Sequence, residues 1–219
     1  MGRALVERLL ERGHDVRVLV RPGNEGKVPQ GASIVHGNAL DAATFAPSVT
    51  PARTYVHLTG VAHPAPWKHR QFRDIDLASL RASALAAAAS ISHFIYVSVA
   101  HPAPVMKAYI RVRSECEAIL QDQTRFGTTI LRPWYVLGPG HWWPVALKPF
   151  YLLLEKCPAT REGAQRLGLV TLAQMVGALI WAVENPHTAS RTLDVPAILK
   201  TQPTTAGLAR PVTQNSISF

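Results

Sequence analysis

Arg21 places a permanent positive charge where a predicted strand ends, a position from which a side chain can bind phosphate. Val16, Val18 and Val20 alternate as strand residues do, and Gly13 stands where the cap of a preceding helix belongs. The apolar stripe of that helix is made by Leu5, Val6, Leu9 and Leu10. The segment therefore predicts the helix and second strand of a nucleotide-binding βαβ unit. An ordinary amphipathic helix followed by a strand explains this segment, taken alone, equally well.

Histidine, cysteine and tryptophan side chains are weaker candidates. His57, His63 and His69 are six residues apart, a spacing that does not place metal ligands on one face of a helix or strand, so we expect no metal site. Cys116 has no histidine arrangement near it in the sequence, and with Cys157 it is more simply a packing residue. Three tryptophans either wall an apolar substrate pocket or cap the core: Trp134, Trp142 and Trp143.

The composition favours a basic protein with one sizeable core. The 219 residues carry 23 Lys and Arg against 14 Asp and Glu, a formal net charge of +9. Because these cations are scattered, phosphate-bearing small molecules fit better than a nucleic-acid groove. The two cysteines suit a reducing compartment, and no apolar stretch of about 18 residues or signal core occurs, so we expect a cytoplasmic protein without a membrane span.

Strand-like and helix-like segments alternate along the chain, which predicts an α/β fold with a parallel sheet. We expect strands at residues 16–20, 33–36, 54–58, 94–99 and 128–131, and helices at about residues 70–90, 105–121, 145–154 and 172–183. The alternation stops after Arg132, and we expect a small substrate-covering region from about residue 133. Residues 1–199 then form one domain, and residues 200–219, rich in Thr, Pro, Gln and Ser, form a poorly ordered tail.

Several sequence blocks carry a family resemblance through their order and spacing. They are residues 94–99 (FIYVSV), 109–113 (YIRVR) with Glu115 and Glu117, 129–133 (TILRP) and 136–140 (VLGPG). The chain resembles the extended or atypical branch of the short-chain dehydrogenase/reductase superfamily from residue 2 to about residue 195. It is most similar in character to NAD(P)-binding epimerase/dehydratase proteins and to the nucleotide-binding subunit of respiratory complex I. This resemblance implies a Rossmann-type, doubly wound parallel sheet.

The resemblance also implies a nicotinamide dinucleotide, with NADP preferred to NAD. Gly2 matches the last glycine of the Gly-rich loop, where the lack of a side chain lets helix and strand pack closely. Arg21 matches the basic position that favours NADP, and Asn38 falls where an Asp usually lies beside the adenine. The remaining expected cofactor contacts are Leu58, Thr59 and Gly60 on a turn past the ribose and phosphates, and Pro133 and Val136 near the nicotinamide.

For catalysis, the resemblance implies a serine, a tyrosine and a lysine four residues after the tyrosine. Ser98 matches the residue that orients a substrate oxygen, and Tyr109 matches the acid/base. Arg113 stands where the family has lysine, and it keeps the positive charge but effectively never deprotonates. Electrostatic activation of Tyr109 can survive this change, whereas the proton relay of the lysine cannot. Without the surrounding blocks, Tyr109 and Arg113 are better explained as an i, i+4 surface pair.

The family's first strand and the first two glycines of its phosphate loop have no counterpart in the sequence. That strand lies in the middle of the sheet, so its absence leaves unpaired backbone groups on both neighbours, each costing about 1–3 kcal/mol if buried. We weigh a start codon assigned about ten residues too late, a fragment, and a chain that closes the gap in another way, and we favour the first. If the short form is real, we expect weak or absent NADP binding.

Two functions from different classes follow. The first is an NADP-preferring oxidoreductase or epimerase/dehydratase-like enzyme acting on a carbonyl or hydroxyl group of a small molecule, with Tyr109, Ser98 and Arg113 in the site. The second is a cofactor-binding sensor or assembly module without turnover, which the arginine at position 113 favours. Nucleic-acid binding is a weaker third interpretation, and a homodimer is compatible with either of the first two.

Overall fold

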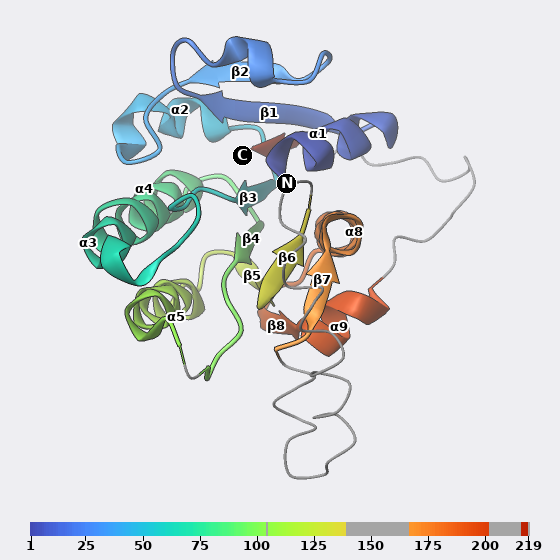
Figure 1. The fold of residues 1–219 in the computed structure, drawn as a ribbon. Coiled ribbons are helices and arrows are strands. Elements are labelled where there is room, and N and C mark those ends of the chain that lie inside the picture. Colours follow the sequence, from blue (N-terminus) through green and yellow to red (C-terminus); the bar gives the residue numbers. More distant parts are fainter. Residues whose placement is uncertain (104, 139–166, 202–215, 219) are drawn as a thin grey trace.

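One parallel sheet forms the centre of the computed structural model, which describes residues 1–103, 105–138, 167–201 and 216–218. The strands lie in the order β2-β1-β9-β3-β4-β5-β8, and every described neighbouring pair is parallel (Figure 1). Their bounds are β2 Ser33–His36, β1 Asp15–Val20, β9 Ser216–Ser218, β3 Thr54–His57, β4 His93–Val97, β5 Gly127–Arg132 and β8 Ser190–Asp194. The α/β fold with a doubly wound parallel sheet is therefore confirmed.

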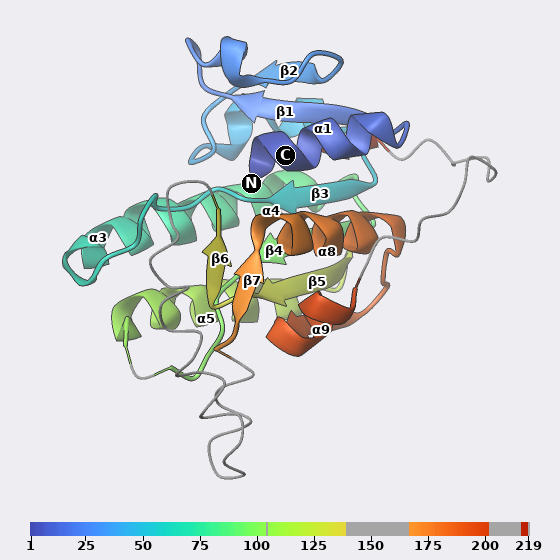
Figure 2. The same cartoon turned by 45° about the vertical axis from the view of Figure 1, so that its right-hand side comes forward.

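Helices cover both faces of this sheet and enclose two apolar cores (Figures 1 and 2). One face packs against α1 (Gly2–Glu11), α8 (Leu172–Glu184) and α9 (Val195–Lys200). The other packs against α2 (Ala46–Val49), the helical run from residue 69 to residue 87, and α5 (Lys107–Gln121). Alternate residues of one strand enter opposite cores, as Ile95 and Tyr96 do, because side chains alternate across a sheet.

The first helix forms for the reasons the sequence gives. Leu5, Val6 and Leu9 are buried on one face of α1, and Gly13, just past its end, has a φ of 81° that suits glycine. The end of α1 is tied to the end of α8, because Arg12 Nη2 donates to Glu184 Oε2 at 2.8 Å. Helix α8 begins with a capping box, in which the backbone N–H of Gln174 donates to Thr171 Oγ1.

The helical run from residue 69 to residue 87 contains a π-helical segment. It comprises α3 (His69–Gln71), η4 (Phe72–Leu77) and α4 (Ala78–Ala87), of which η4 is the π-helical part. The sequence predicts one regular helix here. A π turn takes up more residues than an α turn, so the set of positions facing the sheet changes across it. Asp76 lies in η4 and is buried, with an exposed fraction of 1%.

Several short elements were not predicted from the sequence, among them β6 (Tyr135–Leu137), β7 (Leu169–Thr171), β8 and α9. Strands β6 and β7 form a separate parallel pair, and β8 lies at the edge of the main sheet. Helix α9 follows β8 directly. The predicted helix at residues 145–154, and most of the predicted substrate-covering region, lie outside the described residues. No helix in the described part of the chain is both long and apolar enough to cross a membrane.

Strand β9 lies between β1 and β3, where the sequence predicts a central gap. Ser216, Ile217 and Ser218 pair in parallel with residues 15–17 of β1, and Ile217 and Ser218 pair with the first two residues of β3. The sequence predicts a poorly ordered tail from residue 200, whereas residues 216–218 form a strand whose pairing with two neighbours satisfies their backbone groups. Residues 202–215 and 219 lie outside the described part.

Candidate functional site

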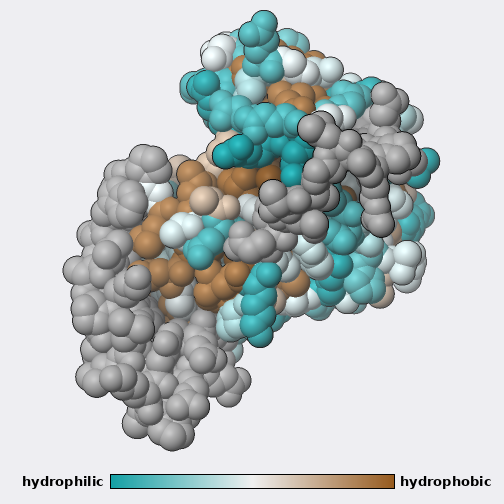
Figure 3. Space-filling model, turned by 90° about the vertical axis from the view of Figure 1, so that its right-hand side faces the viewer, coloured by the Kyte–Doolittle hydropathy of each residue, from teal (hydrophilic) through white to brown (hydrophobic). Residues whose placement is uncertain are grey.

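A cleft of about 400 Å³ lies at the carboxyl ends of β1 and β3. It begins where β9 stops, because β9 pairs with β1 only as far as Arg17 while β1 continues to Val20. Ligands of open α/β sheets bind at this edge. The predicted cofactor residues that line the cleft are Gly2, Arg21, Leu58 and Thr59. In Figure 3, apolar surface lies beneath the upper lobe of the molecule, the lobe that α1, β1 and β2 form in Figure 1.

Three cationic residues contribute to the otherwise largely apolar lining of the cleft. Arg3 and Lys27 contribute to it, but Arg3 is paired with Glu7, Nε to Oε1 at 2.9 Å, and Lys27 donates to Asn24 Oδ1 at 2.7 Å. Arg21 is exposed and makes no ion pair with any described residue. The first turn of α1, which opens at the cleft, has no acidic residue. Backbone N–H groups at a helix start and an unpaired guanidinium are groups that bind phosphate.

Gly2 lines the cleft, but packing alone does not require a glycine there. A Cβ atom added to Gly2 would lie 3.7 Å from Leu58 Cδ1, which is an ordinary van der Waals contact. The close helix-to-strand contact that the sequence predicts at this position is thus not tight enough to exclude alanine. A side chain at residue 2 would instead occupy space in the cleft.

The other predicted cofactor residues do not line this cleft. Asn38 is exposed, and its Oδ1 accepts a hydrogen bond from the Leu40 backbone at 3.1 Å in a local turn, while its neighbour Ala39 does line the cleft. Pro133 is buried, and its carbonyl accepts from the Ala100 backbone at 2.9 Å. Val136 in β6 packs against the core on the α8 side. Gly60 lies instead over a second group of side chains, centred on Arg113.

Arg113 is buried and has partners from three elements. Its Nη2 lies 2.5 Å from Asp76 Oδ1, and its Nη1 donates to Tyr96 Oη and to the Val97 carbonyl, each at 3.0 Å. Its Cζ lies 5.0 Å from the ring centroid of Tyr109, one turn earlier on α5, within the range of a cation–π contact. The sequence predicts that Tyr109 and Arg113 form an i, i+4 pair. They do form one, and the guanidinium of Arg113 is buried.

Gly60 is required by this ion pair. A Cβ atom at residue 60 would lie 2.6 Å from Arg113 Nη2 and 2.9 Å from Asp76 Oδ1, both closer than non-bonded atoms approach. The family resemblance assigns Gly60 to a turn beside the cofactor. In the structure, the absence of its side chain also leaves room for the buried charges beneath that turn.

Burial dominates the protonation of this group. It raises the pKa of the Tyr109 phenol, although Arg113 lowers that pKa and Asp76 raises it further. Burial also raises the pKa of Asp76 against the opposing effect of Arg113. For Arg113, burial lowers the pKa, but Tyr96, Tyr109 and Asp76 together raise it more. Arg113 thus stays charged. It lowers the pKa of Tyr109, but by less than burial raises it.

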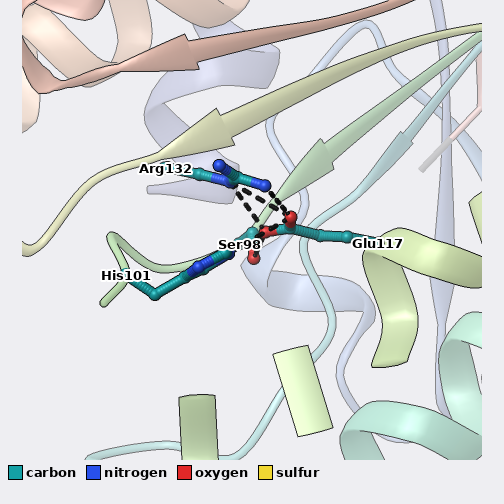
Figure 4. A network of polar contacts seen from close by, with 4 residues as sticks. All are labelled: Ser98, His101, Glu117 and Arg132. Carbon is teal, nitrogen blue, oxygen red and sulfur yellow. Dashed lines mark hydrogen bonds and ion pairs between the residues drawn. The ribbon is translucent and has the colours of Figure 1, made fainter. Parts of the chain in front are cut away.

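Ser98 belongs to a different polar cluster, shown in Figure 4. Its hydroxyl donates to Glu117 Oε1, and Arg132 at the end of β5 donates through Nε to both Glu117 oxygens at 3.1 Å. His101 Nε2 lies 3.3 Å from Glu117 Oε2. Among the described residues, no hydrogen bond joins Ser98 to Tyr109. The two clusters are nevertheless neighbours, because Arg113 binds the carbonyl of Val97.

Sequence reasoning missed Asp76 and the role of Glu117. Glu117 stands four residues after Arg113, so both lie on the face of α5 that carries Tyr109. A run of charged residues on a helix face that must also cover a sheet is a signal for buried ion pairs. No comparable signal marks Asp76, because its burial depends on the packing of η4 against α5. In the described ranges, no group of three or more His, Cys, Asp or Glu residues could hold a metal ion.

Comparisons with known proteins agree with this fold. A structure of gox2253 aligns with a TM-score of 0.63 and 21% identity over 88% of this chain and 66% of that one, so the chain spans slightly less than two thirds of its length. A short-chain dehydrogenase/reductase superfamily protein from Agrobacterium tumefaciens, with bound NAD, aligns with a TM-score of 0.61 and 17% identity. The alignment covers 90% of this chain and 77% of that one. UDP-glucose 4-epimerase from Thermus thermophilus, in complex with NAD, aligns with a TM-score of 0.63 and 14% identity. The alignment covers 90% of this chain and 77% of that one. No curated protein matches the chain.

The family model for NAD(P)H-binding proteins matches residues 1–138, a range that includes β1, β3, the cleft and the Tyr109–Arg113 pair. This match covers more than half of the chain, and the solved structures agree with it in fold. The chain belongs to the NAD(P)H-binding family, and its fold is that of the short-chain dehydrogenase/reductase superfamily.

Proposed function

We propose that the chain binds NADP in the cleft between β1 and β3 and acts as an oxidoreductase or epimerase/dehydratase-like enzyme on a carbonyl or hydroxyl group of a small molecule. The observation that carries the proposal is the convergence of Gly2, Arg21, Leu58 and Thr59 on one cleft. Its volume lies within the range of ligand sites, and its unpaired Arg21 suits an anionic group. The start of α1 suits the pyrophosphate, and Arg21 suits the 2′-phosphate.

The residues of the chain have separable roles in this proposal. When bound, the nicotinamide supplies hydride transfer. Tyr109 moves a proton to or from the substrate oxygen, with the charge of Arg113 5.0 Å from its ring. Ser98 orients the substrate oxygen, the role that the family resemblance implies. Its hydroxyl donates its own proton to Glu117, so its oxygen is the atom left to accept a hydrogen bond. Pro133 and Val136 belong near the nicotinamide in the same assignment.

Arg21→Ala is expected to weaken NADP binding about tenfold and to leave NAD binding unchanged, because only NADP carries a 2′-phosphate for a charge-assisted hydrogen bond. Calorimetric titration of both dinucleotides measures the two affinities. Arg8→Ala is the matched control, because Arg8 is an exposed arginine on α1 that is paired with Glu11 and lies outside the cleft lining. An equal loss of affinity for NAD and NADP would contradict the assignment of Arg21.

Tyr109→Phe is expected to reduce cofactor-dependent turnover at least about 100-fold while cofactor affinity is retained, because the ring remains and only the transferable proton is lost. The change in NADPH absorbance, measured across a panel of small aldehydes, ketones and alcohols, gives the turnover. Equal rates for the variant and the unmodified chain would overturn the role of Tyr109.

A second function has its own support: a cofactor-binding sensor or assembly module without turnover. Arg113 is held by Asp76, Tyr96 and the Val97 carbonyl, so the residue at the lysine position is committed to structural contacts. Cofactor binding without turnover on the whole panel would favour this module over the enzyme.

A further inference from the structure

Asp76 is a buried carboxylate to which the proposed mechanism gives no role. It lies in the π-helical segment η4, with its Oδ1 2.5 Å from Arg113 Nη2. Its Oδ2 accepts a hydrogen bond from the Val61 backbone at 3.2 Å. Gly60 covers the pair so closely that no side chain fits above it. A buried charge at such a place needs a compensating partner, and Arg113 is that partner.

Three elements place titratable groups around Tyr109 and its partner Arg113. From α5 come Arg113 and the thiol of Cys116, from η4 comes Asp76, and from β4 comes Tyr96, whose hydroxyl accepts from Arg113. Phe72 of η4 packs on the Tyr109 ring, with 4.9 Å between centroids, and supplies an apolar wall. Arg113 is the one cation among these groups, and Asp76 is the group that opposes it with a full negative charge at contact distance.

We propose that Asp76 is a positioning residue that neutralises Arg113 and thereby keeps Tyr109 in its protonated form, the form that can give a proton to a substrate oxygen. An unopposed guanidinium stabilises a nearby phenolate, whereas a guanidinium paired with a carboxylate has little net field at the ring. Asp76 also fixes where the guanidinium lies, together with Tyr96 and the Val97 carbonyl. The inference rests on the proposed function of Tyr109 as acid/base.

The proton balance of that step is simple. Tyr109 gives its hydroxyl proton to the carbonyl oxygen, and a bound reduced nicotinamide would supply the hydride that the carbonyl carbon needs, so the product is an alcohol. Tyr109 is left as a phenolate beside Arg113 and recovers a proton from water. A site that started from the phenolate would instead be suited to take a proton from an alcohol. The raised pKa of Tyr109, caused first by burial and further by Asp76, agrees with a protonated resting state.

The test is a titration of Tyr109 that needs neither cofactor nor substrate. The tyrosinate signal of Tyr109 is obtained by ¹³C NMR of tyrosine-labelled protein and assigned by its absence in Tyr109→Phe. Asp76→Asn is expected to shift the Tyr109 midpoint down by about one pH unit, because Arg113 then acts unopposed. Asp74→Asn is the matched control, because Asp74 is an exposed carboxylate of the same segment, and we expect no shift.

The outcomes separate this inference from the proposed function. A Tyr109 midpoint that is unchanged in a folded Asp76→Asn protein would overturn the inference and leave cofactor binding and turnover untouched. If Asp76→Asn does not fold, the unmodified chain still decides, because a Tyr109 midpoint at or below that of free tyrosine would overturn the inference. A shifted midpoint in a protein that turns over no substrate would support the role of Asp76 while the proposed enzyme fails.

Discussion

Arg113→Met is expected to lower the free energy of unfolding by about 3–5 kcal/mol. The change leaves the Asp76 carboxylate without its counter-charge at 1% exposure, and it removes the donor to Tyr96 Oη and the Val97 carbonyl. Methionine keeps much of the side-chain volume, so the loss measures the charge and hydrogen bonds more than a cavity. Urea unfolding followed by tryptophan fluorescence gives the free energy.

Two further variants separate the buried pair from a general effect of losing an arginine. Asp76→Leu combined with Arg113→Met replaces both charges by apolar groups and is expected to recover most of the lost stability. Arg73→Met removes an arginine whose side chain is 58% exposed and which pairs with Glu115, and its cost should stay below about 1 kcal/mol. An Arg113→Met protein as stable as the Arg73→Met protein would refute the importance of the buried ion pair.

Acid is expected to destabilise the protein in a window set by two buried histidines. Burial lowers the pKa of His57 to about 3 and that of His93 to about 4, from an ordinary value of 6.5. As the pH falls below 6.5, the unfolded chain binds protons that the folded chain rejects, so stability is lost from there down to about pH 4 for His93 and about pH 3 for His57. At about 1.4 kcal/mol per unit, each histidine contributes a loss on the order of 3–5 kcal/mol.

His57→Asn checks this pH dependence directly. The asparagine amide can keep a hydrogen bond to Ser83 Oγ, which lies 3.1 Å from His57 Nδ1, but it does not titrate. Urea unfolding at a series of pH values should therefore give a flatter curve for the variant below pH 6.5. His69→Asn removes an exposed histidine as the control and should leave the slope as it is. Superimposable curves for His57→Asn and the unmodified chain would contradict the prediction.

The elements that the sequence predicted well are those with a strong apolar period. Strand β2 has the predicted bounds, β1 differs by one residue at its start, and α5 and α8 lie within two residues of the predicted helices. Strand β8 was missed because it is an edge strand in which Leu193 is the one buried side chain, so it lacks the continuous apolar character of a central parallel strand. Strand β9 was missed because a segment rich in Ser, Thr and Gln resembles a tail in composition.

The candidate site was predictable where one element positions the side chains. The spacing of Tyr109 and Arg113 on one helix implies their contact, and the alternation of β1 implies that Arg21 lies at a strand end. Contacts between distant elements were not predictable in this way. Asp76 meets Arg113 where η4 packs against α5, and Glu117 meets Arg132 where β5 ends beside α5. Such contacts depend on packing, which the local sequence pattern does not encode.

The position of β9 bears on how the molecule folds. The strand between β1 and β3 comes from residues 216–218, and it pairs with residues 15–17, which are made early in synthesis. The pairing therefore has a very high contact order and closes a loop of nearly the entire chain. On a ribosome, the units β1–β2 and β3–β4–β5 can form before residue 216 emerges, whereas the join between them cannot. Until then, facing edges of β1 and β3 are open to other strands, so this join is the step most exposed to aggregation and the one a chaperone would have to protect.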